Sequence, residues 1–97
     1  MSLSTKRWFE AVVPGGHVGA GRVADRKIFI WAADVMDAFS ILRKSVRGWK
    51  KSRTPYSVVP VEDQTQANAL EETIRSTPGV TLERVRKNGF YYCERLP

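Results

Sequence analysis

The sequence holds very few of the residues from which covalent or metal-dependent sites are built. It contains one cysteine, Cys93, and one histidine, His17, among 97 residues. A single cysteine forms no intramolecular disulfide, and one histidine with one cysteine does not complete the four-ligand set that zinc prefers. We therefore predict no metal and no cofactor, and the cysteine usage favours a reducing, cytoplasmic location.

Long hydrophobic runs are absent as well. The longest one is Ile28–Ala33, far below the roughly 20 residues that a membrane-spanning helix needs. The N-terminus, Met1–Arg7, has no apolar core or small-residue cleavage site behind its charges, so it does not resemble a signal peptide. We expect no membrane partner.

Catalytic motifs are equally scarce. His17 lies in a glycine-rich segment without an identifiable partner, so a solvated loop histidine is a better interpretation than a general acid or base. The run Gly15–Arg22 lacks the Gly-Lys-Ser/Thr ending of a phosphate-binding loop, and Cys93 lies among aromatic residues, as a packing residue would. These features predict a protein without enzymatic activity.

The size and composition are those of one soluble globular domain. The chain is 42% hydrophobic and 27% charged, and its length is too short for two domains with separate cores. We predict a single domain over residues 1–97, with a disordered N-terminus at residues 1–5.

The first half of the chain predicts two strands and a helix. Residues 6–13 alternate as a strand does. In the expected strand 27–33 both alternating sets of residues 28–33 are apolar, which suits a strand covered on both faces or an interior one. A flexible glycine-rich loop, residues 14–26, is expected between them. Asp34 is a candidate N-cap for the helix, and Gly48 can end it. The apolar stripe of this helix is Val35, Phe39, Leu42, Val46 and Trp49.

The second half predicts a short strand, a second helix and a hairpin. Pro60 ends residues 56–59 or places them at a sheet edge, and Asp63 resembles the cap of a helix that runs to about Ser76. The helix stripe is Ala67, Leu70 and Ile74. Residues 80–86 and 90–95 are expected to form strands that turn at Asn88-Gly89. The predicted class is therefore α+β, in one two-layer domain, with a mixed sheet of about five strands in the order ββαβαββ and two helices packed on it.

Charge is the most informative departure from an average composition. The net charge is +6, and residues 1–53 hold 11 basic and 4 acidic side chains, whereas residues 54–97 hold 5 and 6. Much of the excess lies where the first helix ends and a loop begins, without one acidic residue between. These bases are Arg43, Lys44, Arg47, Lys50, Lys51 and Arg53. Such a group suits phosphate contact better than a mixed, solvated helix face.

Aromatic residues accompany the bases at two places. Trp49 is a candidate for stacking on an unpaired base, although its place on the helix stripe favours a core position. In the expected C-terminal hairpin, Arg84, Arg86 and Tyr91 would point away from the helices together with Arg95, and form a second surface suited to single-stranded nucleic acid.

Two hypotheses follow from these patterns. The first is a non-enzymatic nucleic-acid-binding module that favours RNA over DNA, because no helix-turn-helix is evident. The second is a protein-interaction or assembly subunit, a homo-oligomer or part of a larger assembly, joined through its basic and acidic helix faces or through open sheet edges. An enzyme is the third choice, and only His17 and the glycine-rich segment support it.

Overall fold

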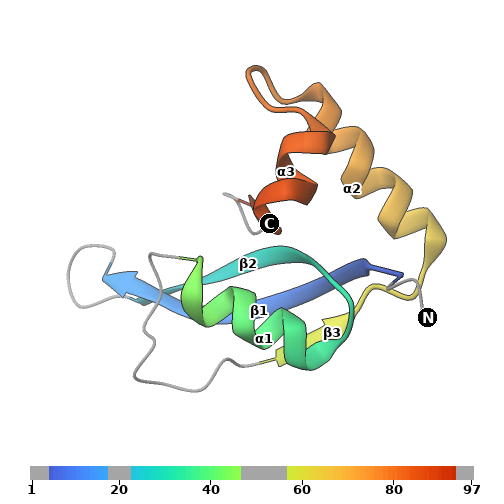
Figure 1. Ribbon diagram of the computed structural model, residues 1–97. Coiled ribbons are helices and arrows are strands. Elements are labelled where there is room, and N and C mark those ends of the chain that lie inside the picture. The colour runs from blue at the N-terminus through green and yellow to red at the C-terminus, as the bar shows by residue number, and fades with distance from the viewer. Residues whose placement is uncertain (1–4, 18–22, 47–56, 94–97) are drawn as a thin grey trace.

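The computed structural model describes residues 5–17, 23–46 and 57–93 (Figure 1). Within these residues the elements are β1 (Arg7–His17), β2 (Val23–Ala32), α1 (Val35–Lys44), β3 (Ser57–Pro60), α2 (Gln64–Ser76), α3 (Leu82–Asn88) and β4 (Phe90–Cys93). The predicted α+β class is confirmed, but the order is ββαβααβ, so one expected strand is a helix.

The strands form one antiparallel sheet in the order β3-β1-β2-β4. The hairpin of β1 and β2 is its centre, and the two short strands pair antiparallel with the outer sides of β1 and β2. The prediction of a mixed sheet of about five strands was therefore wrong. Pro60 is the last residue of the edge strand β3, where its missing N–H costs no ladder bond.

The central hairpin is longer than the sequence suggested. Pro14 does not end the first strand, because β1 continues to His17, and β2 already begins at Val23. The strand register shifts between Pro14 and His17. A bulge of this kind lets a strand pass a residue that cannot donate to the ladder.

Helix α1 begins as predicted. The Asp34 carboxylate accepts the Asp37 N–H at 2.8 Å, and the Asp37 carboxylate accepts the Ala33 N–H at 2.9 Å. These reciprocal bonds satisfy backbone donors that the first helical turn leaves open. The stripe residue Leu42 is fully buried together with Val46, which follows the helix.

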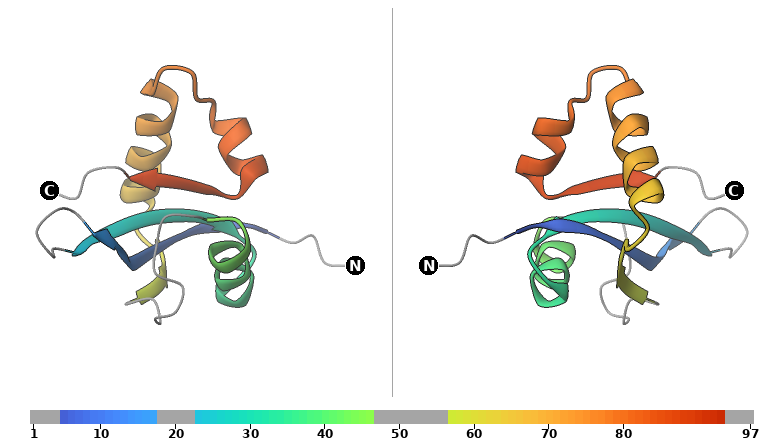
Figure 2. Two further views of the ribbon diagram at one scale, coloured as in Figure 1. Left: turned by 90° about the vertical axis from the view of Figure 1, so that its left-hand side faces the viewer. Right: turned by 90° about the vertical axis from the view of Figure 1, so that its right-hand side faces the viewer.

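Helices cover both faces of the sheet, so the domain has three layers instead of the predicted two (Figure 2). On one face α1 packs on Ile28 and Ile30, and on the other α2 and α3 pack against Trp8, Phe29 and Trp31. Alternate residues of a strand point to opposite faces. Because β2 has apolar residues on both faces, a helix layer must pack on each face to bury them. The expectation that residues 27–33 are covered on both faces is thus confirmed.

The segment expected as a strand at residues 80–86 is the helix α3. Thr81 caps it by accepting the Arg84 N–H at 3.1 Å, and Gly89 ends it with a left-handed φ of 95°. The Asn-Gly pair suits a hairpin turn and a helix end equally well, since both need a residue with positive φ. Leu82 and Val85 are three residues apart, and the helix packs both on the sheet.

Candidate nucleic-acid interface

A groove lies between α3, β4 and the end of α2, and we call it the β4 groove. Its volume is about 650 Å³. Its lining residues are Thr73, Thr77, Gly79, Val80, Arg84, Val85, Asn88, Phe90, Tyr91 and Tyr92. Two residues predicted for a binding surface, Arg84 and Tyr91, therefore share this groove, although a helix and a strand supply them instead of two strands.

The backbone sets the position of the aromatic residues in the groove. The Gly89 carbonyl accepts the Trp31 N–H at 2.8 Å, which aligns β4 so that Tyr91 lies opposite Phe29. The Tyr91 hydroxyl lies 3.2 Å from the Thr77 hydroxyl oxygen at the end of α2. The ring of Tyr91 is consequently held in place while remaining half-exposed.

Exposed basic residues lie on α3, where Arg84 lines the groove, and on α1, which covers the other face of the sheet. Arg84 and Lys87 are exposed on α3, and Arg43 and Lys44 are exposed in the last turn of α1. The two helices approach at the end of α3, where a Cβ added to Gly89 would lie 3.5 Å from the Ile41 side chain of α1. The other predicted residues, Arg47, Trp49, Lys50, Lys51 and Arg53, lie outside the described residues.

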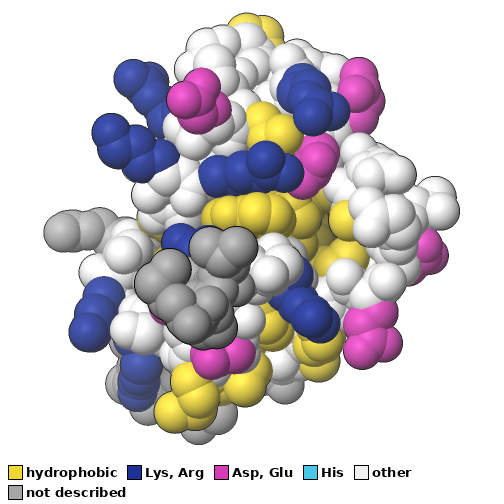
Figure 3. Space-filling model, turned by 45° about the vertical axis from the view of Figure 1, so that its right-hand side comes forward, with side chains coloured by type: hydrophobic (Ala, Val, Ile, Leu, Met, Phe, Trp, Pro, Cys, Tyr) yellow, Lys and Arg dark blue, Asp and Glu magenta, His cyan; other side chains and the backbone are white. Residues whose placement is uncertain are grey.

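Several of these cations form no ion pair with another residue that the structure describes. The ion pairs of the described residues join Lys27 to Glu10 and join Arg75 and Arg86 to carboxylates of α2. None of them includes Arg43, Lys44, Arg84 or Lys87. Figure 3 shows how basic, acidic and hydrophobic side chains mix on one side of the molecule. The unpaired cations keep their full charge for an anionic partner.

Arg86 does not lie in the β4 groove, so its predicted placement beside Arg84 and Tyr91 was wrong. Its guanidinium carbon lies 4.4 Å from the centroid of a Trp31 ring, and its Nη2 donates to the Glu71 carboxylate at 2.6 Å. Residues two apart share a face on a strand but point in different directions on a helix. In a strand over residues 80–86, Arg84 and Arg86 would share a face. In the helix α3 they point in different directions. Arg95 lies outside the described residues.

The residues around Arg86 form a cluster that the sequence did not reveal, and we call Trp8, Trp31, Glu71 and Arg86 the Glu71 cluster. The indole N–H of Trp8 donates to Glu71 at 2.9 Å, and the two tryptophan rings are 4.9 Å apart. The pairing depends on residues 63 positions apart, and no local pattern indicates it.

The surroundings of Glu71 lower its pKa. Burial by itself raises the pKa of this carboxyl, but hydrogen bonds from Trp8 and Arg86 and the charges of Arg86 and Arg75 outweigh that effect. Glu71 is thus a stabilised anion that neutralises Arg86, and the cluster serves the packing of α2 and α3 on the sheet.

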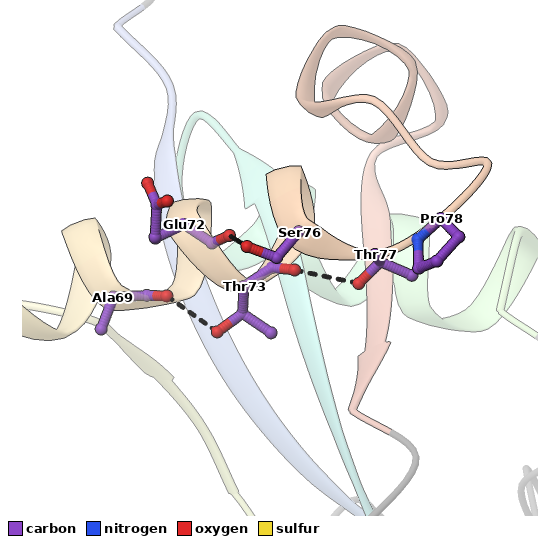
Figure 4. Close-up of a pocket in the computed structure, with 6 residues that line it drawn as sticks. All are labelled: Ala69, Glu72, Thr73, Ser76, Thr77 and Pro78. Carbon is purple, nitrogen blue, oxygen red and sulfur yellow. Dashed lines mark hydrogen bonds between the residues drawn. The ribbon is translucent and has the colours of Figure 1, made fainter.

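A further hollow of about 540 Å³ lies along α2 (Figure 4). The hydroxyls of Thr73, Ser76 and Thr77 line it, and each donates at 2.9 Å to a backbone carbonyl four residues earlier. These polar groups are satisfied within the helix, which makes the hollow a poorer candidate site than the β4 groove.

No family model, curated protein or solved structure matches this chain. In the parts of the chain that the structure describes, no helix is long and apolar enough to cross a membrane, and no three His, Cys, Asp or Glu residues gather as a metal site would require.

Proposed function

We propose that this protein is a small nucleic-acid-binding module without enzymatic activity, and that RNA is favoured over DNA. The observation that supports the proposal most is the β4 groove, which Arg84 of α3 and the aromatic ring of Tyr91 line together on the face that α2 and α3 cover. Aromatic rings stack on unpaired bases, and arginine binds phosphate. RNA offers unpaired bases more often than DNA does.

Further phosphate contacts would form at the end of α1, which covers the other face of the sheet. Arg43 and Lys44 are exposed there, and the chain continues into the basic segment with Arg47, Lys50, Lys51 and Arg53. Each phosphate contact releases counterions, so the binding constant is expected to fall steeply with salt.

Fluorescence anisotropy with labelled RNA and DNA of several sequences, measured from low to physiological salt, tests this proposal. We expect Arg84→Ala and Lys87→Ala each to weaken binding about three- to tenfold and to reduce the salt slope by about one. Charge reversal at Lys50, Lys51 and Arg53 is expected to weaken binding to many sequences alike. Absence of any binding at low salt would contradict the proposal.

Arg75→Ala is the matched control for Arg84→Ala. Arg75 is an arginine of similar exposure on α2, where it lies 3.8 Å from the Glu72 carboxylate. Its removal changes the net charge by the same amount but leaves the groove intact. If Arg84→Ala and Arg75→Ala weaken binding equally, the affinity comes from general attraction by the net charge and not from the groove.

Protein assembly is the second candidate, because of the sheet edges. Among the described residues neither β3 nor β4 has a strand on its outer side. Val59, a hydrophobic residue of the edge strand β3, is 46% exposed. Open edges pair with other chains, although four residues ending in a proline make β3 a poor template. A salt-sensitive oligomer without affinity for nucleic acid, detected by light scattering, would support assembly, whereas a monomer in all conditions would contradict it.

A further inference from the structure

We infer that the nucleic acid is bound as a single strand, whose bases enter two joined hollows on either side of Tyr91. This inference rests on the proposed function and specifies its ligand. The β4 groove is joined by a second hollow of about 320 Å³, and Thr73 and Tyr91 line both. Both volumes lie in the range of about 300–1,000 Å³ in which small ligands are held.

The floor between the two hollows is aromatic. Phe29 of β2 and Tyr91 of β4 are register partners on the face that α2 and α3 cover, and both are half-buried. Side chains opposite each other on neighbouring antiparallel strands are about 5 Å apart. The two rings therefore offer neighbouring surfaces to successive bases, which is how sheets bind unpaired RNA.

Basic residues lie at opposite ends of this path. Arg84 lines the β4 groove, and Lys27 lines the second hollow, where its Nζ lies 3.2 Å from a Glu10 carboxylate oxygen. The side chains of Lys27 and Glu10 are 30% and 32% exposed, so water screens their pairing and a phosphate can compete for the lysine. A strand with one phosphate near each cation would place its bases over Tyr91 and Phe29.

Polar side chains along the path suit the edges of bases. Asn88 lines the first hollow, Gln66 lines the second, and Thr73 lies between them. Amide side chains both donate and accept hydrogen bonds, so they match any base edge. In a duplex these edges are paired and the base faces are stacked, which leaves a duplex only its phosphates to offer to Arg84 and Lys27.

Binding of one RNA sequence as a single strand and as a duplex, at one salt concentration, tests the inference. We expect the single strand to bind about tenfold more tightly, as stacking of one or two bases implies. Lys27→Ala is expected to weaken binding of the single strand about threefold or more, with little effect on the duplex. Arg26→Ala is the matched control, because Arg26 is the neighbouring exposed base on β2 and belongs to the opposite face.

Ultraviolet crosslinking of the bound strand, followed by mass spectrometry of the peptides, provides a second readout that does not depend on a variant folding. Crosslinks at Phe29 and Tyr91 are the expected result. Equal affinity for single strand and duplex, or crosslinks confined to other segments, would overturn the inference and leave the proposed function standing. If no nucleic acid binds, both this inference and the proposed function are wrong.

Discussion

Glu71 connects three elements through one carboxylate. It accepts hydrogen bonds from Trp8 on β1 and Arg86 on α3 while lying on α2, and its side chain is only 18% exposed. Removing its charge leaves Arg86 half-buried over Trp31 without a counterion. Loss of one partner of such a pair costs more than the pair itself contributes, because the remaining charge stays desolvated.

Glu71→Gln is therefore expected to lower the free energy of unfolding by about 1.5–3 kcal/mol, the usual range for hydrogen bonds to charged groups. Urea denaturation followed by circular dichroism measures the change. Glu72→Gln is the matched control, since the Glu72 side chain is 73% exposed, and its effect is expected to stay within about 0.5 kcal/mol. Equal effects of the two substitutions would contradict the role of Glu71.

The lowered pKa of Glu71 predicts a dependence of stability on pH. The ordinary value, 4.5, applies to the unfolded chain, whereas the folded protein holds the pKa below it. The unfolded chain therefore takes up the proton at a higher pH than the folded protein does. The stabilisation is fully present above pH 4.5 and is lost as the pH falls through the folded pKa.

The difference in unfolding free energy between the wild-type protein and Glu71→Gln should consequently narrow when the pH falls from 7 to below 4.5. Urea denaturation of both proteins at several pH values measures this difference. A difference that stays constant over that range would show that the charge of Glu71 contributes nothing.

At the scale of an element, α3 is the segment that needs its surroundings most. It has only seven residues, too few for a helix that is stable alone in water. Thr81 at its start, Gly89 at its end and the buried side chain of Val85 hold it. Because α3 also carries Arg84 and Lys87, the proposed interface depends on this short helix.

We expect Thr81→Ala to lower the free energy of unfolding by about 1 kcal/mol, the usual cost of a lost N-cap. Thr81→Ser keeps the hydroxyl that accepts the Arg84 N–H at 3.1 Å and should be close to the wild-type protein. Amide hydrogen exchange at Arg84, faster in Thr81→Ala alone, localises the effect. Unchanged exchange in both variants would mean that packing by itself forms the helix.

At the scale of the whole molecule, one sheet serves two separate cores. Leu42 of α1 is buried on one face and Ile74 of α2 on the other, each with no exposed surface. Neighbouring residues of β2, such as Ile28 and Phe29, thus pack in different cores. Unfolding of either helix layer would expose apolar strand residues, so we expect the layers to unfold together.

Leu42→Ala and Ile74→Ala test this coupling, and each is expected to cost about 2–5 kcal/mol as a large-to-small change in a core. Circular dichroism reports on all helices. In proteins that also carry Trp49→Phe, which removes the third tryptophan, the fluorescence of Trp8 and Trp31 reports on the face under α2 and α3. Coincident transitions in both variants are the expected result. Separate transitions in Leu42→Ala would show that the α1 layer unfolds independently.

Local patterns predicted several elements correctly. Asp34 and Asp63 begin their helices, the stripe of Leu70 and Ile74 is buried, and residues 27–33 are covered on both faces. Each of these depends on residues within one or two turns of a helix or along one strand, so the chain itself carries the information.

The binding surface was predicted only in part. Arg84 and Tyr91 line one groove, but on the face that α2 and α3 cover instead of on a hairpin surface turned away from the helices, and Arg86 turns toward Trp31. The error follows from one ambiguous segment, because Thr81–Gly89 suits a capped helix as well as a strand and turn. Local preferences alone do not distinguish the helix from the strand in this segment. The helix is favoured once Val85 is buried against the sheet.

By itself the sequence determined the class of the fold, the starts of two helices and the basic excess of the first 53 residues, since composition and periodicity are local properties of the chain. Only the tertiary structure decided that the sheet is covered twice, that Arg86 neutralises Glu71, and that Arg84 and Tyr91 line one groove. These outcomes depend on contacts between residues far apart in the sequence, whose energies exist only once the layers have packed.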